Sequence, residues 1–464
     1  MGCAKGARNF LYCMLRFLLY ILAGILSSFY LFPIEFKAMP GINTKMVMAA
    51  VGVCLFLCDC ARKSAPYFDL GLIKIVILGF VVSFIGFLSV VLNNTHDYTY
   101  AMYFVSMFVW LGGAYTMLKA LQWAHGKVSL HLLCNYLVGV CVGQCVSALL
   151  IEYIPAFSNF VDRYVLGVGF NSNFSDLKGQ RMYGIGAMLD VAGQRFSAIL
   201  LIIAWLVTQK SVQESKTKLT YYILSFIFIV IIGNMIGRTT TVGALMAIGY
   251  WGYVFVYKNH QLRKVVGALA VILCLTLPVI IYLYNSNITF YNNTKFAFEG
   301  FFSLASTGKC ETHSNNVLQS MIRIPEKTST WLIGDGYFND PASDPYYIGY
   351  MWKFFYMGTD IGYLRFVYYF GIFGLLAFSL YFIAIGRYLS GKFPHVKVLF
   401  WGIVLLNFVV WLKVSSDLFS ILALFVLLPA FSGADLTEKV GERRECKPEL
   451  VSNENCRSYS ERFL

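Results

Sequence analysis

The 464-residue chain is 58% hydrophobic and only 13% charged, and its mean hydropathy is +0.64. These values exclude an ordinary soluble domain and predict an all-α polytopic membrane protein, because a bilayer core of about 30 Å requires roughly 20 apolar residues in each helical span. No strand-period alternation is present, which argues against a membrane barrel. The net charge of +13 is spread over short loops and a tail, so it indicates orientation in a bilayer rather than binding to nucleic acid.

Twelve apolar runs predict transmembrane spans within one domain, residues 1–432. They cover residues 10–31, 45–58, 71–91, 99–121, 132–154, 193–209, 219–236, 239–257, 265–284, 359–386, 397–412 and 416–432. A cytoplasmic N-terminus places the Lys- and Arg-rich loops on the inner side, as the positive-inside rule requires. The tail, residues 433–464, is polar and has no apolar period, so it is predicted to be a disordered cytoplasmic extension.

This topology leaves two long loops on the outer face, residues 155–192 and 285–358. Loops of this length in a compact protein are usually functional or disordered. Both contain aromatic residues together with Gly and Asn turn signals, so they are predicted to fold over the outer membrane surface, the second with some helix. The second contains the sequence from Trp331 to Phe338 and leads into the tenth apolar run, which carries Asp360 and Arg365.

Familiar catalytic motifs are missing from the sequence. It contains no Gly-x-x-x-x-Gly-Lys-Ser/Thr phosphate loop, no His-Glu-x-x-His zinc motif and no Gly-x-Ser-x-Gly nucleophile motif. Most of the twelve cysteines lie inside apolar runs, where they behave as small hydrophobic residues. Chemistry that depends on ATP, zinc or a serine nucleophile is therefore unsupported, and no cofactor is predicted.

Several arginines remain near the predicted outer face. Arg181 and Arg195 flank the start of the sixth span, Arg238 separates the seventh from the eighth, and Arg365 lies inside the tenth. Arginine suits phosphate because its planar fork donates two charge-assisted hydrogen bonds, and a helix start such as that after Arg238 also attracts anions. The alternative to phosphate binding is that an arginine extends its guanidinium to the lipid headgroups or pairs with an acidic residue. This alternative is favoured for Arg195 taken alone. A convergent set of arginines predicts a site for a lipid-linked diphosphate.

Two residues are candidates for a general base. His313 is the better placed of the two histidines outside the membrane, and histidine commonly serves as a base near neutral pH. Asp360 could bind an acceptor, take a proton or cap its helix. It stands five residues before Arg365, too far round a helix for the usual i,i+4 pair. Asp335, between two glycines, is predicted to shape a turn.

The order of these motifs resembles the O-antigen polymerase and ligase superfamily of bacterial envelopes. The resemblance covers about residues 155–386 and rests on four segments. They are Arg181-Met-Tyr-Gly184, Gly237-Arg238-Thr239-Thr240, Gly334-Asp-Gly336-Tyr-Phe338, and Asp360-Ile-Gly-Tyr-Leu-Arg365 followed by Tyr369-Phe-Gly371-Ile-Phe-Gly374. Thr359-Asp360 stands where ligases and some polymerases have a His-Asn pair, which favours polymerase over ligase.

The resemblance implies transfer of a growing glycan from undecaprenyl diphosphate to a sugar hydroxyl of the next lipid-linked repeat unit. Diphosphate binding is assigned to Arg181, Arg238 and Arg365, with Arg195 as a weaker fourth, and acceptor activation to Asp360 or His313. The donor is already activated, so neither a nucleotide nor a metal is required. The implied setting is the bacterial inner membrane, with both termini cytoplasmic and the active face periplasmic; a chain-length regulator and a flippase are possible protein partners.

Two other functions stay open on the sequence. A ligase that moves glycan onto lipid A core or another acceptor shares nearly all of these features. A polysaccharide transporter or flippase would show internal repeats, broken spans in paired positions and polar residues near the midplane. No repeat is visible in the sequence, and its polar residues are concentrated outside the apolar runs.

Overall fold

A computed structural model describes residues 2–62, 70–166, 181–258, 263–309, 312–341 and 355–432. The predicted disordered tail, residues 433–464, lies outside these ranges, as does part of each predicted long loop. Within the described ranges the chain is almost entirely helical, and its one sheet has two short strands.

A helix lies at every predicted apolar run. The helices are α1 (Gly2–Leu31), α2 (Thr44–Ala61), α3 (Leu70–Leu92), α4 (Tyr103–His125), α5 (Leu130–Tyr153), α6 (Pro155–Tyr164), α7 (Leu189–Val207), α8 (Lys210–Gln213), α9 (Lys216–Ile236), α10 (Thr240–Lys258), α11 (Arg263–Ser286), α12 (Ile288–Ala297), α13 (Glu299–Thr307), α14 (His313–Ser320), α15 (Thr328–Leu332), α16 (Gly362–Lys392), α17 (Lys397–Val410) and α18 (Phe419–Leu427). Single-turn 3₁₀ helices lie at Tyr356–Gly358, Pro394–Val396 and Leu428–Ala430.

Eight helices in the described part of the chain are long and apolar enough to cross a membrane: α1 to α5, α7, α9 and α16. Shorter apolar helical stretches lie at Cys274–Ser286, Pro394–Val410 and Phe419–Ala430. The prediction of a helical, multi-pass membrane protein is therefore confirmed. The count of twelve spans goes beyond what these lengths alone establish.

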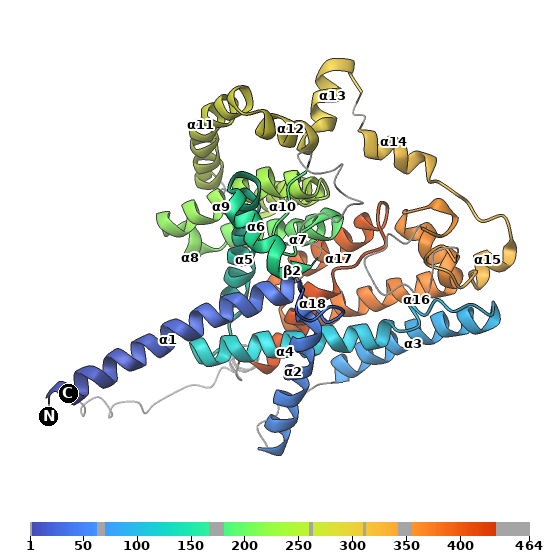
Figure 1. The fold of residues 1–464 in the computed structure, drawn as a ribbon, viewed down its shortest axis with the longest axis horizontal. Helices are drawn as coiled ribbons and strands as arrows, with labels where there is room; N and C mark the ends of the chain where they lie inside the picture. Colours follow the sequence, from blue (N-terminus) through green and yellow to red (C-terminus); the bar gives the residue numbers. More distant parts are fainter. Residues whose placement is uncertain are drawn as a thin grey trace, which may run out of the picture.

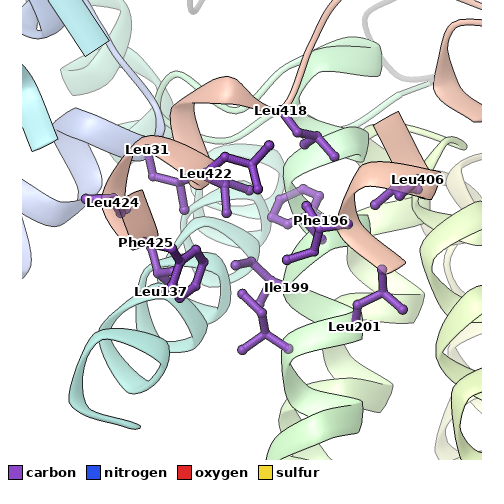
Figure 2. Close-up of a cluster of buried hydrophobic side chains, with 14 of the residues drawn as sticks. Leu31, Leu137, Phe196, Ile199, Leu201, Leu406, Leu418, Leu422, Leu424 and Phe425 are labelled. Carbon is purple, nitrogen blue, oxygen red and sulfur yellow. The ribbon is translucent and has the colours of Figure 1, made fainter. Parts of the chain in front are cut away.

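Helix α7 is surrounded by other helices. Every residue from Ala192 to Val207 is buried, and so is every residue of α18. Figure 2 shows side chains of α5, α7, α17 and α18 gathered in one cluster, which includes Phe196 and Phe425. Burial on all sides explains why α18 is apolar all round rather than on one face.

Small residues allow close helix contacts. Gly52 of α2 lies against Gly112 of α4, and a Cβ at Gly52 would overlap the carbonyl oxygen of Gly112. Gly243 of α10 lies in the same way against Ser197 of α7. Such contacts are typical of membrane helices, which associate through tight packing because hydrocarbon on both sides removes the hydrophobic driving force.

Short polar segments connect these helices. Strand β1 (Glu35–Phe36), between α1 and α2, pairs antiparallel with β2 (Val165–Leu166), which follows α6. The helices α12 to α15 form an arc that leads from α11 to the start of α16 (Figure 1). This arc occupies most of the second predicted long loop.

Helix α16 is interrupted after its second turn. Phe370 (φ −135°, ψ 17°) and Gly371 (φ 66°, ψ −171°) leave helical geometry, and the positive φ at Gly371 favours glycine. A Cβ at Gly371 would also overlap the carbonyl oxygen of Leu332. The apolar run predicted one continuous span here, which is wrong in this detail, because composition does not show where two backbones meet.

Candidate functional site

An acidic and a basic residue from distant parts of the chain meet at one end of α7. Asp190, in the first turn of α7, accepts a hydrogen bond of 2.8 Å from Lys413 Nζ. It accepts a second bond of 2.6 Å from Thr239 Oγ1, next to the start of α10. Lys413 lies on the connection between α17 and α18. The ends of three helical segments therefore converge on the Asp190 carboxylate.

Arg365 lies beside this group, in the first turn of α16. Its Nη1 is 3.0 Å from Ser415 Oγ and 3.5 Å from Asp360 Oδ1, and its Nη2 donates to the Phe338 carbonyl at 2.9 Å. The guanidinium carbon is 3.5 Å from the ring centroid of Phe338 and 4.6 Å from that of Phe355. Only 6% of Arg365 is exposed. Its charge is thus held in one orientation by two rings and several oxygen acceptors.

The backbone of the loop before α16 holds the Arg365 turn in place. The break at Gly371 frees the carbonyls of Tyr368 and Tyr369 from their helical partners. They accept hydrogen bonds from the N–H groups of Asp335 (2.6 Å) and Gly336 (3.2 Å). The flanking glycines Gly334 and Gly336 have positive φ, and Asp335 itself lies in irregular backbone, where its carboxylate accepts hydrogen bonds from Thr330 and Tyr356. The same loop thus supplies backbone donors to the broken helix and, at Phe338, an acceptor to Arg365.

Arg181 and Arg238 share one aromatic ring. Their guanidinium carbons lie 4.5 and 4.4 Å from the ring centroid of Phe296, on α12. Arg238 also forms an ion pair with Glu299, at the start of α13. Burial lowers the pKa of Arg181; Asp190 opposes this shift and Arg238 adds to it. An arginine remains charged after such a shift, so two neighbouring cations are held near Asp190.

Two of these arginines retain an unused donor. The Nε atoms of Arg181 and Arg365 are buried and have no hydrogen-bond partner among the described residues. Buried N–H groups are rarely left unpaired in folded proteins, so an unused donor on a cationic side chain is a candidate contact for an anionic ligand. This observation links the two arginine groups to one kind of ligand.

Asp360 has the properties of a base near neutral pH. Burial raises the pKa of its carboxyl group to about 6, with Arg365 opposing the shift and Asp190 adding to it. It lies just before α16, whose N-cap is Ile361, so it does not cap the helix as one alternative predicted. Asp360 and Arg365 do not form the usual i,i+4 pair, but they lie 3.5 Å apart because Asp360 stands before the helix and folds back toward the guanidinium.

Arg195 lies deeper in the helix assembly than the start of α7. Arg195, on α7, is 9% exposed, and its guanidinium carbon lies 5.5 and 5.8 Å from the rings of Phe32 and Trp110. It stands five residues beyond Asp190, about 7.5 Å further along the helix axis. Its assignment as a weaker fourth diphosphate ligand stays a prediction.

His313 is exposed at the start of α14. Its backbone N–H donates to Glu299 Oε1 at 2.9 Å, while the other oxygen of that carboxylate pairs with Arg238. Among the described residues no hydrogen bond involves its imidazole. The structure therefore places the backbone of His313 near Arg238, and Asp360 is the better positioned of the two candidate bases.

The sequence prediction missed Asp190 and Lys413 as members of the site. They are 223 positions apart in the chain, so no local pattern joins them. One signal was available: Lys413 lies on the predicted outer side, where the positive-inside rule expects few basic residues. A lysine retained there points to a local partner or a ligand.

Comparison with protein-family models, with curated proteins and with solved structures finds no match to the chain. The function is therefore argued from its own residues.

Proposed function

We propose that the protein is a membrane glycosyltransferase that polymerises oligosaccharide repeat units carried on undecaprenyl diphosphate. The observation that carries the proposal is that Arg181 and Arg365 each have a buried Nε with no hydrogen-bond partner among the described residues. The Asp190 carboxylate, which pairs with Lys413, interacts electrostatically with Arg181 and with Asp360. Such donors suit a diphosphate leaving group, and Asp360 beside Arg365 suits an acceptor hydroxyl.

The reaction needs two contributions from these side chains, removal of a proton and stabilisation of negative charge. Asp360 takes the proton of the acceptor hydroxyl as its oxygen bonds to the anomeric carbon of the donor sugar. The bond from that carbon to the diphosphate oxygen breaks, and its electron pair leaves with the undecaprenyl diphosphate. Arg181, Arg238 and Arg365 stabilise the negative charge of the departing group. The activated donor supplies the driving force, so the proposed step requires no nucleotide or metal.

The proposed orientation follows from the same residues. Together with the eight long apolar helices, α10, α11, α17 and α18 give the twelve spans of the proposal. An N-terminus in the cytoplasm then puts the start of α7, the start of α10 and the start of α16 on one side. This is the periplasmic side of a bacterial inner membrane, where a flippase delivers lipid-linked units and a chain-length regulator acts.

Deletion of the gene followed by a gel of surface polysaccharide tests the proposal. Collapse of the ladder to a single repeat supports polymerisation. Polymer that accumulates on undecaprenyl diphosphate indicates a ligase instead. If neither of these changes occurs and repeat units are retained on the inner face, the result indicates transport. Complementation of the deletion with the Arg238→Ala variant should fail to restore the ladder. Arg163 is exposed and lies outside the site, so the Arg163→Ala variant should restore it.

A further inference from the structure

The start of α16 packs on the connection between α17 and α18. The N–H of Tyr363 donates to the Trp411 carbonyl at 3.1 Å. Gly362 lies so close to this connection that a Cβ there would overlap two of its backbone carbonyl oxygens. Arg365 follows in the same turn, and its Nη1 donates to Ser415 Oγ at 3.0 Å. The close approach at Gly362 therefore sets the guanidinium against the Ser415 hydroxyl.

The α17–α18 connection is itself fixed by other parts of the molecule. The Ser415 carbonyl accepts a hydrogen bond of 2.9 Å from the hydroxyl of Tyr100, which lies just before α4. The Ser416 carbonyl accepts one of 3.1 Å from Nε2 of Gln194, on α7. Ser415 is only 7% exposed. Its hydroxyl consequently has a defined position that does not depend on Arg365.

Arg365 has a carboxylate beside it, yet its shorter hydrogen bonds go to neutral acceptors. Its Nη1 lies 3.0 Å from Ser415 Oγ, and its Nη2 lies 2.9 Å from the Phe338 carbonyl oxygen. The contact with Asp360 Oδ1 is the longer one, at 3.5 Å. Hydrogen bonds between an arginine and a carboxylate are normally about 2.7 to 2.9 Å long and are often bidentate. Asp360 thus lies near a cation without forming a full ion pair with it.

The Ser415 hydroxyl and the Asp360 carboxylate compete for one donor. Both lie near Nη1 of Arg365, and the serine oxygen is the closer acceptor. The rings of Phe338 and Phe355 lie 3.5 and 4.6 Å from the guanidinium carbon and restrict its rotation. Without the serine hydroxyl, the same nitrogen would have Asp360 as its nearest acceptor among the described residues.

The charged groups around Asp360 come from several elements. Asp360 interacts electrostatically with Arg365 on α16, Asp190 on α7 and Lys413 on the α17–α18 connection. Arg365 also interacts with Asp97, which lies before α4. Burial raises the pKa of Asp360, and Arg365 is the largest opposing influence. A closer bond from Arg365 would lower that pKa, because it stabilises the ionised carboxylate, and would make the carboxylate a weaker base.

We propose that Ser415 is a positioning residue for the base: its hydroxyl accepts the Arg365 donor that would otherwise bond to Asp360, and this leaves the carboxylate free to take a proton. The inference rests on the proposed function, in which Asp360 removes the proton of the acceptor hydroxyl. Ser415 acts through Arg365 and contributes no group to the reaction itself. An arginine bonded mainly to neutral acceptors also keeps its charge for the departing diphosphate.

Replacement of one hydroxyl tests the inference. Ser415→Ala removes the acceptor, and Ser415→Cys replaces it with a weak acceptor of similar size. Ser416→Ala is the matched control, since that neighbouring hydroxyl oxygen is buried and has no hydrogen-bond partner among the described residues. The infrared band of the protonated carboxyl group is titrated against pH on the full-length protein in nanodiscs. Its loss in Asp360→Asn assigns the band.

The midpoint of this titration should lie at about pH 6 in the wild type and in Ser416→Ala. In Ser415→Ala and Ser415→Cys it should fall to about pH 5, because a closer cation stabilises the ionised carboxylate. The rise of kcat/KM with pH should move by the same amount, to a plateau about threefold to tenfold lower. A midpoint that stays at the wild-type value in both Ser415 variants would overturn the inference, as would an equal fall in Ser416→Ala.

Failure of the proposed function gives a different result. The infrared titration requires no substrate, so it judges the effect of Ser415 on Asp360 even if the wild type makes no polymer, the outcome that overturns the proposed function. If the infrared midpoint falls in Ser415→Ala while the pH profile of kcat/KM stays unchanged, Asp360 is not the base and Ser415 has no role in positioning one.

Discussion

Arg365 and Arg195 are both almost fully buried on apolar helices, yet their surroundings differ. Arg365 bonds to a serine hydroxyl, a backbone carbonyl and a carboxylate, and its neighbours come from a long polar loop. Arg195 has the rings of Phe32 and Trp110 beside it, and it interacts electrostatically with Lys45 and Asp417. Burial of an arginine in a membrane is costly in both places, so burial alone does not identify a ligand-binding residue.

The comparison suggests that the function of a buried arginine depends on what reaches it from outside the membrane. The loop from Leu332 to Asn339 contacts α16 twice, at the broken helix and at the guanidinium. The loop therefore holds both the helix break and the Arg365 guanidinium. Arg195 lies further along α7 and has no such loop contact among the described residues. We accordingly expect Arg365 to act on substrate and Arg195 to stabilise the helix assembly.

The largest expected effect is that of Arg365→Ala. Loss of a preorganised donor to a departing anion lowers kcat by about 10² to 10³ in comparable sites. Polymer synthesis from lipid-linked repeat units, measured on purified protein, should fall by this factor. Arg365→Lys should restore little, because lysine keeps the charge and loses the planar fork. Full activity in Arg365→Lys would show that charge alone is sufficient.

Asp360→Asn should have the next largest effect, about 100-fold on kcat/KM. A base acts in its ionised form, so wild-type kcat/KM should rise with pH up to about 6, the pKa of Asp360, and level off above it. Asp360→Asn should lack that rise. A rise through about 6 that persists in Asp360→Asn would assign the base to another residue, with His313→Ala as the variant to compare.

Gly371→Ala tests whether the loop holds the Arg365 turn. The positive φ at Gly371 and the overlap with the Leu332 carbonyl predict a loss of about 2 to 4 kcal/mol in the free energy of unfolding, with reduced activity. Gly391→Ala, in the same helix with open space around it, is the control and should leave the free energy of unfolding within about 1 kcal/mol. Similar thermal unfolding of the two variants would show that the contact with Leu332 is easily released.

Arg195→Met should change catalysis least. The methionine keeps much of the volume of the side chain but removes its charge, so the loss should appear in stability, by about 1 to 3 kcal/mol. The KM for the lipid-linked donor should stay within about twofold of the wild-type value. A large increase in KM without loss of stability would instead support Arg195 as a diphosphate ligand.

The helices could be predicted from the sequence because each apolar run is long enough to show the length that a bilayer requires. The grouping of Arg181, Arg238, Arg365 and Asp360 could be predicted in part, because topology assigns residues to one side of a membrane. The pairs Asp190–Lys413 and Arg238–Glu299 could not, since 223 and 61 positions separate their members. The break at Gly371 could not be predicted from the sequence pattern either, because it depends on a loop backbone that packs against the helix.

Reconstitution tests the central claim most directly. Purified protein in liposomes would be supplied with undecaprenyl-diphosphate-linked repeat units, without nucleotide, and the products separated on a gel. The account predicts a ladder of polymer from the wild type and from Arg195→Met, and single repeats from Arg365→Ala. Absence of polymer from the wild type, or an unchanged ladder from Arg365→Ala, would contradict it.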